Sequence, residues 1–204
     1  NGINYINSLL QYFSEPGPVV FTIVYGCGVG VFIAYCTFLS QIVPYSASEF
    51  GFLGFCFVTT GLLGPILSNK VLNRVGCHRN VVCGIIIGSL LSSGHVCISI
   101  WLYPMNRFLV YSSLFLSSMF LTALTADGMD FAAALAFPAD ENIVGGILNV
   151  SAEGFGWIMV HIGGTSMSRV DGFAFNASLC SFLLFAASLF LIVVSEAKLK
   201  RPEG

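Results

Sequence analysis

Long apolar segments alternate with short polar connections along the whole chain. A helix needs about 20 predominantly apolar residues to cross a bilayer. Six segments come close to that length or exceed it: residues 19–42, 50–67, 81–103, 108–137, 143–162 and 173–194. Helix breakers or caps mark the connections, at Pro44 with Ser46, in residues 69–80, at Pro104, at Pro138 and in residues 163–172. The pattern predicts an all-α membrane protein with six transmembrane helices, in which neighbouring helices are antiparallel.

The composition agrees with a chain that lies in a lipid bilayer. Hydrophobic residues make up 56% of the sequence and charged residues 9%, whereas soluble domains carry about 25% charged residues. No basic stripe accompanies the formal net charge of -2, so we expect no nucleic-acid partner. All seven cysteines except Cys77 lie inside apolar segments and none forms a CxxC pair, which indicates packing residues rather than metal ligands.

Lys and Arg are retained on the cytoplasmic side of membrane proteins, so their positions predict the orientation. Three follow the second apolar segment and three follow the sixth: Lys70, Arg74, Arg79, Lys198, Lys200 and Arg201. The loops of the opposite side carry only Arg107 and Arg169. We therefore expect residues 1–18 to form a cytoplasmic N-terminal segment, residues 19–194 the transmembrane bundle and residues 195–204 a cytoplasmic tail.

One carboxylate stands out within the fifth apolar segment, which contains GGILNVSAEGFGW. An ionised carboxylate at the centre of a membrane helix costs about 2.5 to 3.5 kcal/mol, so Glu153 should face protein, water or a ligand. Asn149, Glu153, Trp157 and His161 recur every four residues and share one stripe of a helix. An anion beside an aromatic ring suits an organic cation. The alternative is a protonated Glu153 that only forms a hydrogen bond between helices.

Other polar and small residues have both functional and structural interpretations. Asp127 and Asp130 share one side of the fourth segment near its cytoplasmic end, where Asp130 is a candidate substrate contact; snorkelling is the alternative. Tyr25 is either a cavity aromatic or a packing residue, and His95 is a possible proton carrier. Glycines predict helix contacts at positions 26, 28, 30, 61, 64, 84, 88, 145 and 146. No nucleophile, base and orienting group can be assembled, so we expect no enzyme.

Two blocks of sequence resemble the feline leukaemia virus subgroup C receptor family, which is solute carrier family 49 of the major facilitator superfamily. FTIVYGCGVGVFIAYCTFLSQIV is similar to that family's seventh helix, with Tyr25 before a glycine and a Leu-x-Gln ending at Leu39 and Gln41. MDFAAALAFPADENIVGGILNVSAEGFG is similar to the end of its tenth helix, an acidic loop and the start of its eleventh. The resemblance implies the C-terminal six-helix half of a twelve-helix transporter. The chain also begins without Met, so we expect a longer protein with an N-terminal six-helix half.

Three positions depart from the pattern of that family. Asn73 stands where the superfamily's loop motif has Asp, which puts the gating role of that motif in doubt. Ala134 replaces the second acid of the tenth helix, whereas Asp130 keeps the first in kind. Glu153 replaces a Gln that lines the central substrate cavity in the relatives. Of the three departures, the one at position 153 bears most directly on the substrate cavity.

The resemblance and the stripe together imply a transporter of a small organic cation such as choline, in the plasma membrane, without a cofactor or metal. The candidate substrate-binding residues are Glu153, Trp157, Asn149, Tyr25, Gln41 and Asp130. Haem export, another activity attributed to the family, is one alternative, although two propionates would be repelled by Glu153. A receptor or scaffold that transports nothing is the other, and it leaves an acid inside the membrane unexplained.

Overall fold

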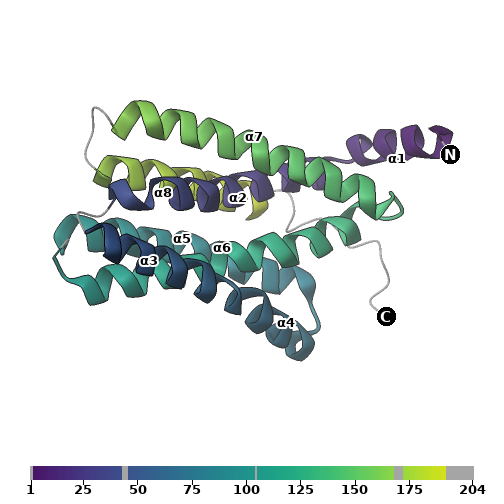
Figure 1. The fold of residues 1–204 in the computed structure, drawn as a ribbon. Helices are drawn as coiled ribbons and strands as arrows, with labels where there is room; N and C mark the ends of the chain where they lie inside the picture. Colours follow the sequence, from purple (N-terminus) through teal and green to yellow (C-terminus); the bar gives the residue numbers. More distant parts are fainter. Residues whose placement is uncertain (1, 43–45, 104, 168–171, 192–204) are drawn as a thin grey trace.

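The computed structural model describes residues 2–42, 46–103, 105–167 and 172–191, and all its regular elements in these ranges are helices (Figure 1). In chain order they are α1 Gly2–Ser14, α2 Pro16–Ile42, α3 Ala47–Gly61, α4 Leu63–Val75, α5 His78–Leu102, α6 Arg107–Ala136, α7 Glu141–Met167 and α8 Gly172–Leu189. Pro44, Pro104, Arg169 and the basic residues of the tail lie outside the described residues. The all-α prediction is confirmed for the part of the chain that the structure describes.

Five helical segments in the described ranges are long and apolar enough to cross a membrane. They are Pro16–Ile42, Ala47–Val75, His78–Leu102, Arg107–Ala136 and Glu141–Gly164. These segments contain the first five predicted spans, except for a residue or so at the ends of the third and fourth. In α8 the apolar stretch Ala177–Leu189 is shorter. The protein is therefore a multi-pass membrane protein.

The predicted connection at residues 69–80 is wrong in extent, because most of it is helical. Helix α4 continues to Val75, and the turn into α5 is confined to Gly76 and Cys77. Gly76 has a φ of 66° and its amide donates a 2.8 Å hydrogen bond to the carbonyl of Leu72, which closes the helix with a left-handed residue. Polar residues marked a connection in the sequence, but Lys, Leu and Arg are all good helix formers, so α4 continues past the apolar segment.

The second membrane segment is broken at Leu62 between α3 and α4, and Pro65 explains the break. Proline has no amide hydrogen, so the carbonyl of Gly61, four residues earlier, loses its partner within the helix. The hydroxyl of Thr122 on α6 donates a 2.6 Å hydrogen bond to that carbonyl. One turn earlier, Ser118 donates to the carbonyl of Phe57 at 2.5 Å. Helix α6 therefore satisfies the backbone that the break leaves open.

Helix α2 lies inside the bundle, and α7 lies on its outer side. Helix α2 packs most extensively on α7 and also contacts α6 and α8, while α5 packs against α6 and α8. Figure 1 shows α7 along one edge, α2 and α8 beneath it, and α3 with α4 on the opposite side. The ring of Phe21 lies in edge contact with Phe131 on α6, at a centroid distance of 4.9 Å. The core therefore surrounds α2.

Helices α2 and α7 run parallel and approach closely where the predicted glycines lie. A side chain at Gly26 would meet Ser151 and Phe155, and one at Gly30 would meet the backbone of Phe155 and Gly156. The predicted contact role is also confirmed at glycines 28, 61, 64 and 88. It is wrong at glycines 84, 145 and 146, where a side chain would find open space. Gly145 and Gly146 face away from neighbouring helices, and Gly84 faces an open space between α4, α5 and α6, which sequence spacing alone does not reveal.

The N-terminal segment is also helical. In α1 the hydroxyl of Tyr12 donates a 3.2 Å hydrogen bond to the carbonyl of Pro18 and lies 2.5 Å from the Thr22 hydroxyl, which attaches α1 to the first turns of α2. Ile6, Leu10 and Phe13 are exposed on the other side of the helix. Such an apolar stripe is typical of a helix that lies along a membrane surface.

Candidate functional site

The polar stripe predicted from the sequence lies on the exposed face of α7. Asn149, Glu153, Trp157 and His161 are all exposed, whereas Ala152 and, one turn on, Gly156 are buried. Glu153 lies near the middle of Glu141–Met167 and therefore near the centre of the membrane segment. The four-residue spacing predicted this common face, and the pattern of burial confirms it.

Two rings of the stripe are in contact with each other. The indole of Trp157 and the imidazole of His161 lie parallel, with an interplanar angle of 10° and a centroid distance of 5.4 Å. Trp157 is 69% exposed, so the imidazole leaves much of the indole uncovered. An electron-rich ring face with this exposure can attract a cation.

Contacts with α2 fix which side of α7 carries the stripe. The hydroxyl of Ser151 donates a 2.8 Å hydrogen bond to the carbonyl of Thr22. Gly26 and Gly30 on α2 allow Phe155 and Gly156 to approach, as described above. These contacts hold one side of α7 against α2 and turn the opposite side, with Glu153, outward. Sequence reasoning missed Ser151 as a positioning residue, although a small hydroxyl inside an apolar helix is a typical interhelical contact.

The exposed face of α7 differs from that of α3 and α4. The latter presents large apolar side chains: Phe52, Phe55, Val58, Leu62, Leu63 and Ile66. Those side chains suit lipid. The α7 face also exposes Val150, Ile158 and Ile162. Beside them it presents a carboxylate, an amide and an imidazole at membrane depth, where contact with hydrocarbon is unfavourable by about 2.5 to 3.5 kcal/mol for the charge alone. The α7 face therefore fits a protein surface or a water-filled cavity better than lipid.

The other predicted site residues do not lie on α7. Tyr25 is buried, with 1% exposure, and its hydroxyl donates a 3.3 Å hydrogen bond to the carbonyl of Thr125 on α6. Gln41 is exposed at the end of α2, and Asp130 is exposed on α6. The structure brings Asn149, Glu153 and Trp157 together on one face. Tyr25, Gln41 and Asp130 each have different surroundings.

The two aspartates of α6 differ in their environment. Asp127 is buried between helices, and its polar neighbours include Ser68 on α4, His78 at the start of α5 and Asp130 on its own helix. Its Oδ2 has no hydrogen-bond partner among the described residues. Asp130 is exposed. Within the described ranges, no group of three or more His, Cys, Asp or Glu side chains could hold a metal ion. Asp127 therefore belongs to the helix packing rather than to the stripe.

Comparison with known proteins identifies relatives along almost the whole chain. The chain is 28% identical over 205 residues to the human choline/ethanolamine transporter FLVCR2, which covers 98% of this chain and 38% of the human protein. It is 27% identical over 205 residues to an uncharacterized MFS-type transporter of Caenorhabditis elegans, covering 98% of this chain and 35% of that protein. The feline choline/ethanolamine transporter FLVCR1 is 25% identical over 199 residues, and the match covers 96% of this chain and 35% of the feline protein.

The chain spans well under half the length of these curated relatives. No protein-family model matches it. The blocks that carry the resemblance form α2, the end of α6 and the first half of α7, which are the helices that build and position the stripe. Two of these relatives are named choline/ethanolamine transporters and one an MFS-type transporter, and their similarity along almost the whole chain supports its resemblance to the feline leukaemia virus subgroup C receptor family of the major facilitator superfamily.

Proposed function

We propose that this chain is the C-terminal six-helix half of a plasma-membrane transporter that carries choline or a similar small organic cation. Two of the relatives described above are named choline/ethanolamine transporters. The observation that carries the proposal is the outward polar face of α7, with Glu153 at membrane depth and Trp157 one turn away. A second half of the protein, packed against this face, would enclose a site between the two halves.

The chemistry of the stripe suits a quaternary or primary ammonium group. Glu153 supplies a negative charge that attracts the cation over a distance and requires no hydrogen-bond donor from it. The Trp157 indole contributes about 0.5 to 2 kcal/mol through its ring face. Asn149 offers an amide to a substrate hydroxyl. Choline carries all three features: a permanent charge, methyl groups that fit an aromatic face, and one hydroxyl.

Tyr25, Gln41 and Asp130 are proposed as substrate contacts on the resemblance to the family. Each lies on α2 or α6. For Tyr25 the proposal requires its ring to leave the contact with Gly128 and the hydrogen bond to Thr125 during transport. Haem fits less well, because its propionates would be repelled by Glu153. A scaffold would have no use for a charge at this depth.

The orientation proposed here places both chain ends in the cytoplasm. Lys70, Arg74 and Arg79 gather around the turn between α4 and α5. Arg107, at the start of α6, forms a 2.8 Å ion pair with Glu49 near the start of α3. This pair lies at the other end of the bundle from the turn between α4 and α5. The side with more Lys and Arg residues is retained in the cytoplasm.

Uptake of radiolabelled choline by the full-length protein in proteoliposomes tests the proposed function. Glu153→Leu removes the charge and the polar contact, and the loss of one partner of a desolvated charge pair costs about 2 to 5 kcal/mol, so uptake should fall by about 30-fold or more. Glu153→Gln restores the residue of the relatives and should keep uptake with weaker affinity. Glu141→Gln, at the exposed start of the same helix, is the matched control. Unchanged choline uptake in both Glu153 variants would overturn the proposal.

A further inference from the structure

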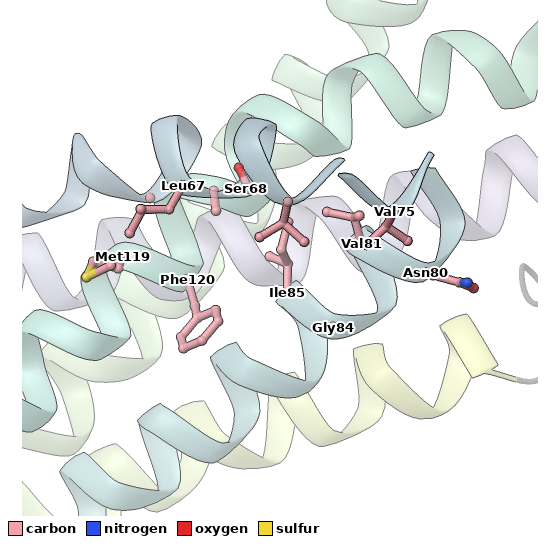
Figure 2. A pocket seen from close by; sticks show the side chains of 12 residues that line it. Leu67, Ser68, Val75, Asn80, Val81, Gly84, Ile85, Met119 and Phe120 are labelled. Carbon is pink, nitrogen blue, oxygen red and sulfur yellow. The ribbon is translucent and has the colours of Figure 1, made fainter. Parts of the chain in front are cut away.

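A cavity lies away from the α7 stripe, between α4, α5 and α6. Its volume is about 470 Å³, which is within the range of small-molecule sites. Figure 2 shows Leu67 on α4, Ile85 on α5 and Phe120 on α6 around the same space. Most of its lining is apolar, and Ser68 and Asn80 are its polar side chains. Helix α7 contributes no lining residue, so this cavity is distinct from the stripe.

The cavity is open toward the outside of the bundle. Leu67, Val71 and Val75 line it and are 46%, 48% and 50% exposed. Gly84 on α5 also lines it, and a side chain built at this glycine would meet nothing within 4 Å. The opening lies on membrane segments, so in the bilayer it faces lipid chains. Lipid is therefore the molecule with direct access to it.

Positive charges border one end of the cavity. Lys70 and Arg74 follow Leu67 along the same side of α4, at spacings of three and seven residues. Arg79 precedes the lining residue Asn80 at the start of α5. All three basic side chains are exposed, and neither Lys70 nor Arg74 forms an ion pair with another described residue. The buried Asp127 contacts Ser68 from the inner side, so its carboxyl lies behind the cavity wall rather than at this rim.

We propose that this groove binds an anionic phospholipid, with one acyl chain in the cavity and the phosphate beside Lys70, Arg74 and Asn80. An apolar slot that ends in basic residues complements an amphiphile of opposite charge. The proposed orientation places this end at the cytoplasmic leaflet, where anionic lipids are concentrated. A free phosphate would leave the apolar slot empty, and a zwitterionic lipid would gain less from the basic rim.

Native mass spectrometry of the full-length protein tests the site with two probes, dioleoyl phosphatidylglycerol and dioleoyl phosphatidylcholine. Wild type should bind the glycerol lipid more tightly. The double variant Lys70→Gln/Arg74→Gln should weaken that binding by about tenfold or more and remove the preference, since each charge near the surface contributes about 1 kcal/mol. Equal binding of both lipids by wild type would overturn the proposal. A preference that survives the double variant would also overturn it.

Filling the cavity tests the position of the acyl chain. Gly84→Leu should reduce phosphatidylglycerol binding, because the new side chain occupies the slot without a clash. Gly94→Leu is the matched control on the same helix, since a side chain there also meets nothing and Gly94 does not line the cavity. A second measurement leaves the cavity open. Phe120→Trp places an additional tryptophan in the cavity wall, and phosphatidylglycerol with brominated chains should quench the fluorescence of that tryptophan. Quenching that is equal for brominated phosphatidylcholine, or that is absent, would contradict the proposed site.

Discussion

The hydroxyl of Thr122 on α6 donates a 2.6 Å hydrogen bond to the carbonyl of Gly61, the last residue of α3. That carbonyl lacks a helical partner because residue 65 is proline. The same hydroxyl is 2.8 Å from the carbonyl of Ser118 in its own helix. One specific side chain thus supplies the hydrogen bond that the break between α3 and α4 leaves open. Removal of that side chain should lower the stability of the protein measurably.

Thr122→Val should destabilise the protein by about 0.6 kcal/mol, the average measured for interhelical hydrogen bonds in a membrane protein, and by no more than the maximum of about 1.7 kcal/mol. Valine keeps the shape and removes the donor. The midpoint of unfolding of the full-length protein in detergent would report the change. Thr59→Val is the control, because Thr59 is exposed and donates only to Phe55 of its own helix among the described residues. An equal loss of stability in both variants would show that the contact with Gly61 contributes nothing specific.

Gly30→Leu should separate α7 from α2. A side chain at Gly30 would meet the backbone of Phe155 and Gly156 at 3.0 and 3.1 Å, and backbone cannot rotate away. We expect a lower unfolding midpoint together with the loss of choline uptake, since the stripe is positioned by this contact. Gly94→Leu, on α5 where nothing lies within 4 Å, should change neither measurement. Normal uptake in Gly30→Leu would mean that the position of the stripe does not depend on α2.

Trp157→Leu should weaken choline binding by about 2- to 30-fold, which corresponds to the loss of a ring face worth about 0.5 to 2 kcal/mol. Trp157→Phe keeps a smaller ring and should lie between wild type and the leucine variant. Equilibrium binding of radiolabelled choline to the purified full-length protein gives these affinities. Trp101→Leu, at the exposed end of α5, is the control. Tighter or unchanged binding in Trp157→Leu would remove the indole from the site.

Single cysteines introduced in a cysteine-free background should report the proposed orientation. Asn73→Cys on α4 should react with a membrane-impermeant maleimide only after the cells are opened, because the basic residues keep this end in the cytoplasm. Met105→Cys, between α5 and α6, should react in intact cells; Met105 is 81% exposed. The reverse pattern of labelling would invert the topology and move the lipid site to the outer leaflet.

The stripe on α7 was predictable because its spacing is local. Residues four apart on a helix share a face whatever else the fold does. The environment of Tyr25 was not predictable in the same way, because α2 is apolar on every side and the sequence offers no polar face to orient it. The support of Gly61 by Thr122 joins residues 61 positions apart, so no local pattern shows it. The extent of α4 was missed because polar residues mark a connection and also form good helices.

The parallel packing of α2 on α7 has a consequence for synthesis of the chain. Gly30 meets its partner Phe155 only after 125 further residues have been translated, which takes about 6 to 25 s. The membrane segment of α2 is the most buried of the five. During that time α2 must remain in lipid without α7, its main neighbour. Its mean hydropathy of 2.1 is the highest of the five membrane segments, which suits a helix that stays in contact with lipid during this time. The apolar surface of α2 thus keeps the helix stable in lipid during synthesis, before the same surface forms the core of the finished bundle.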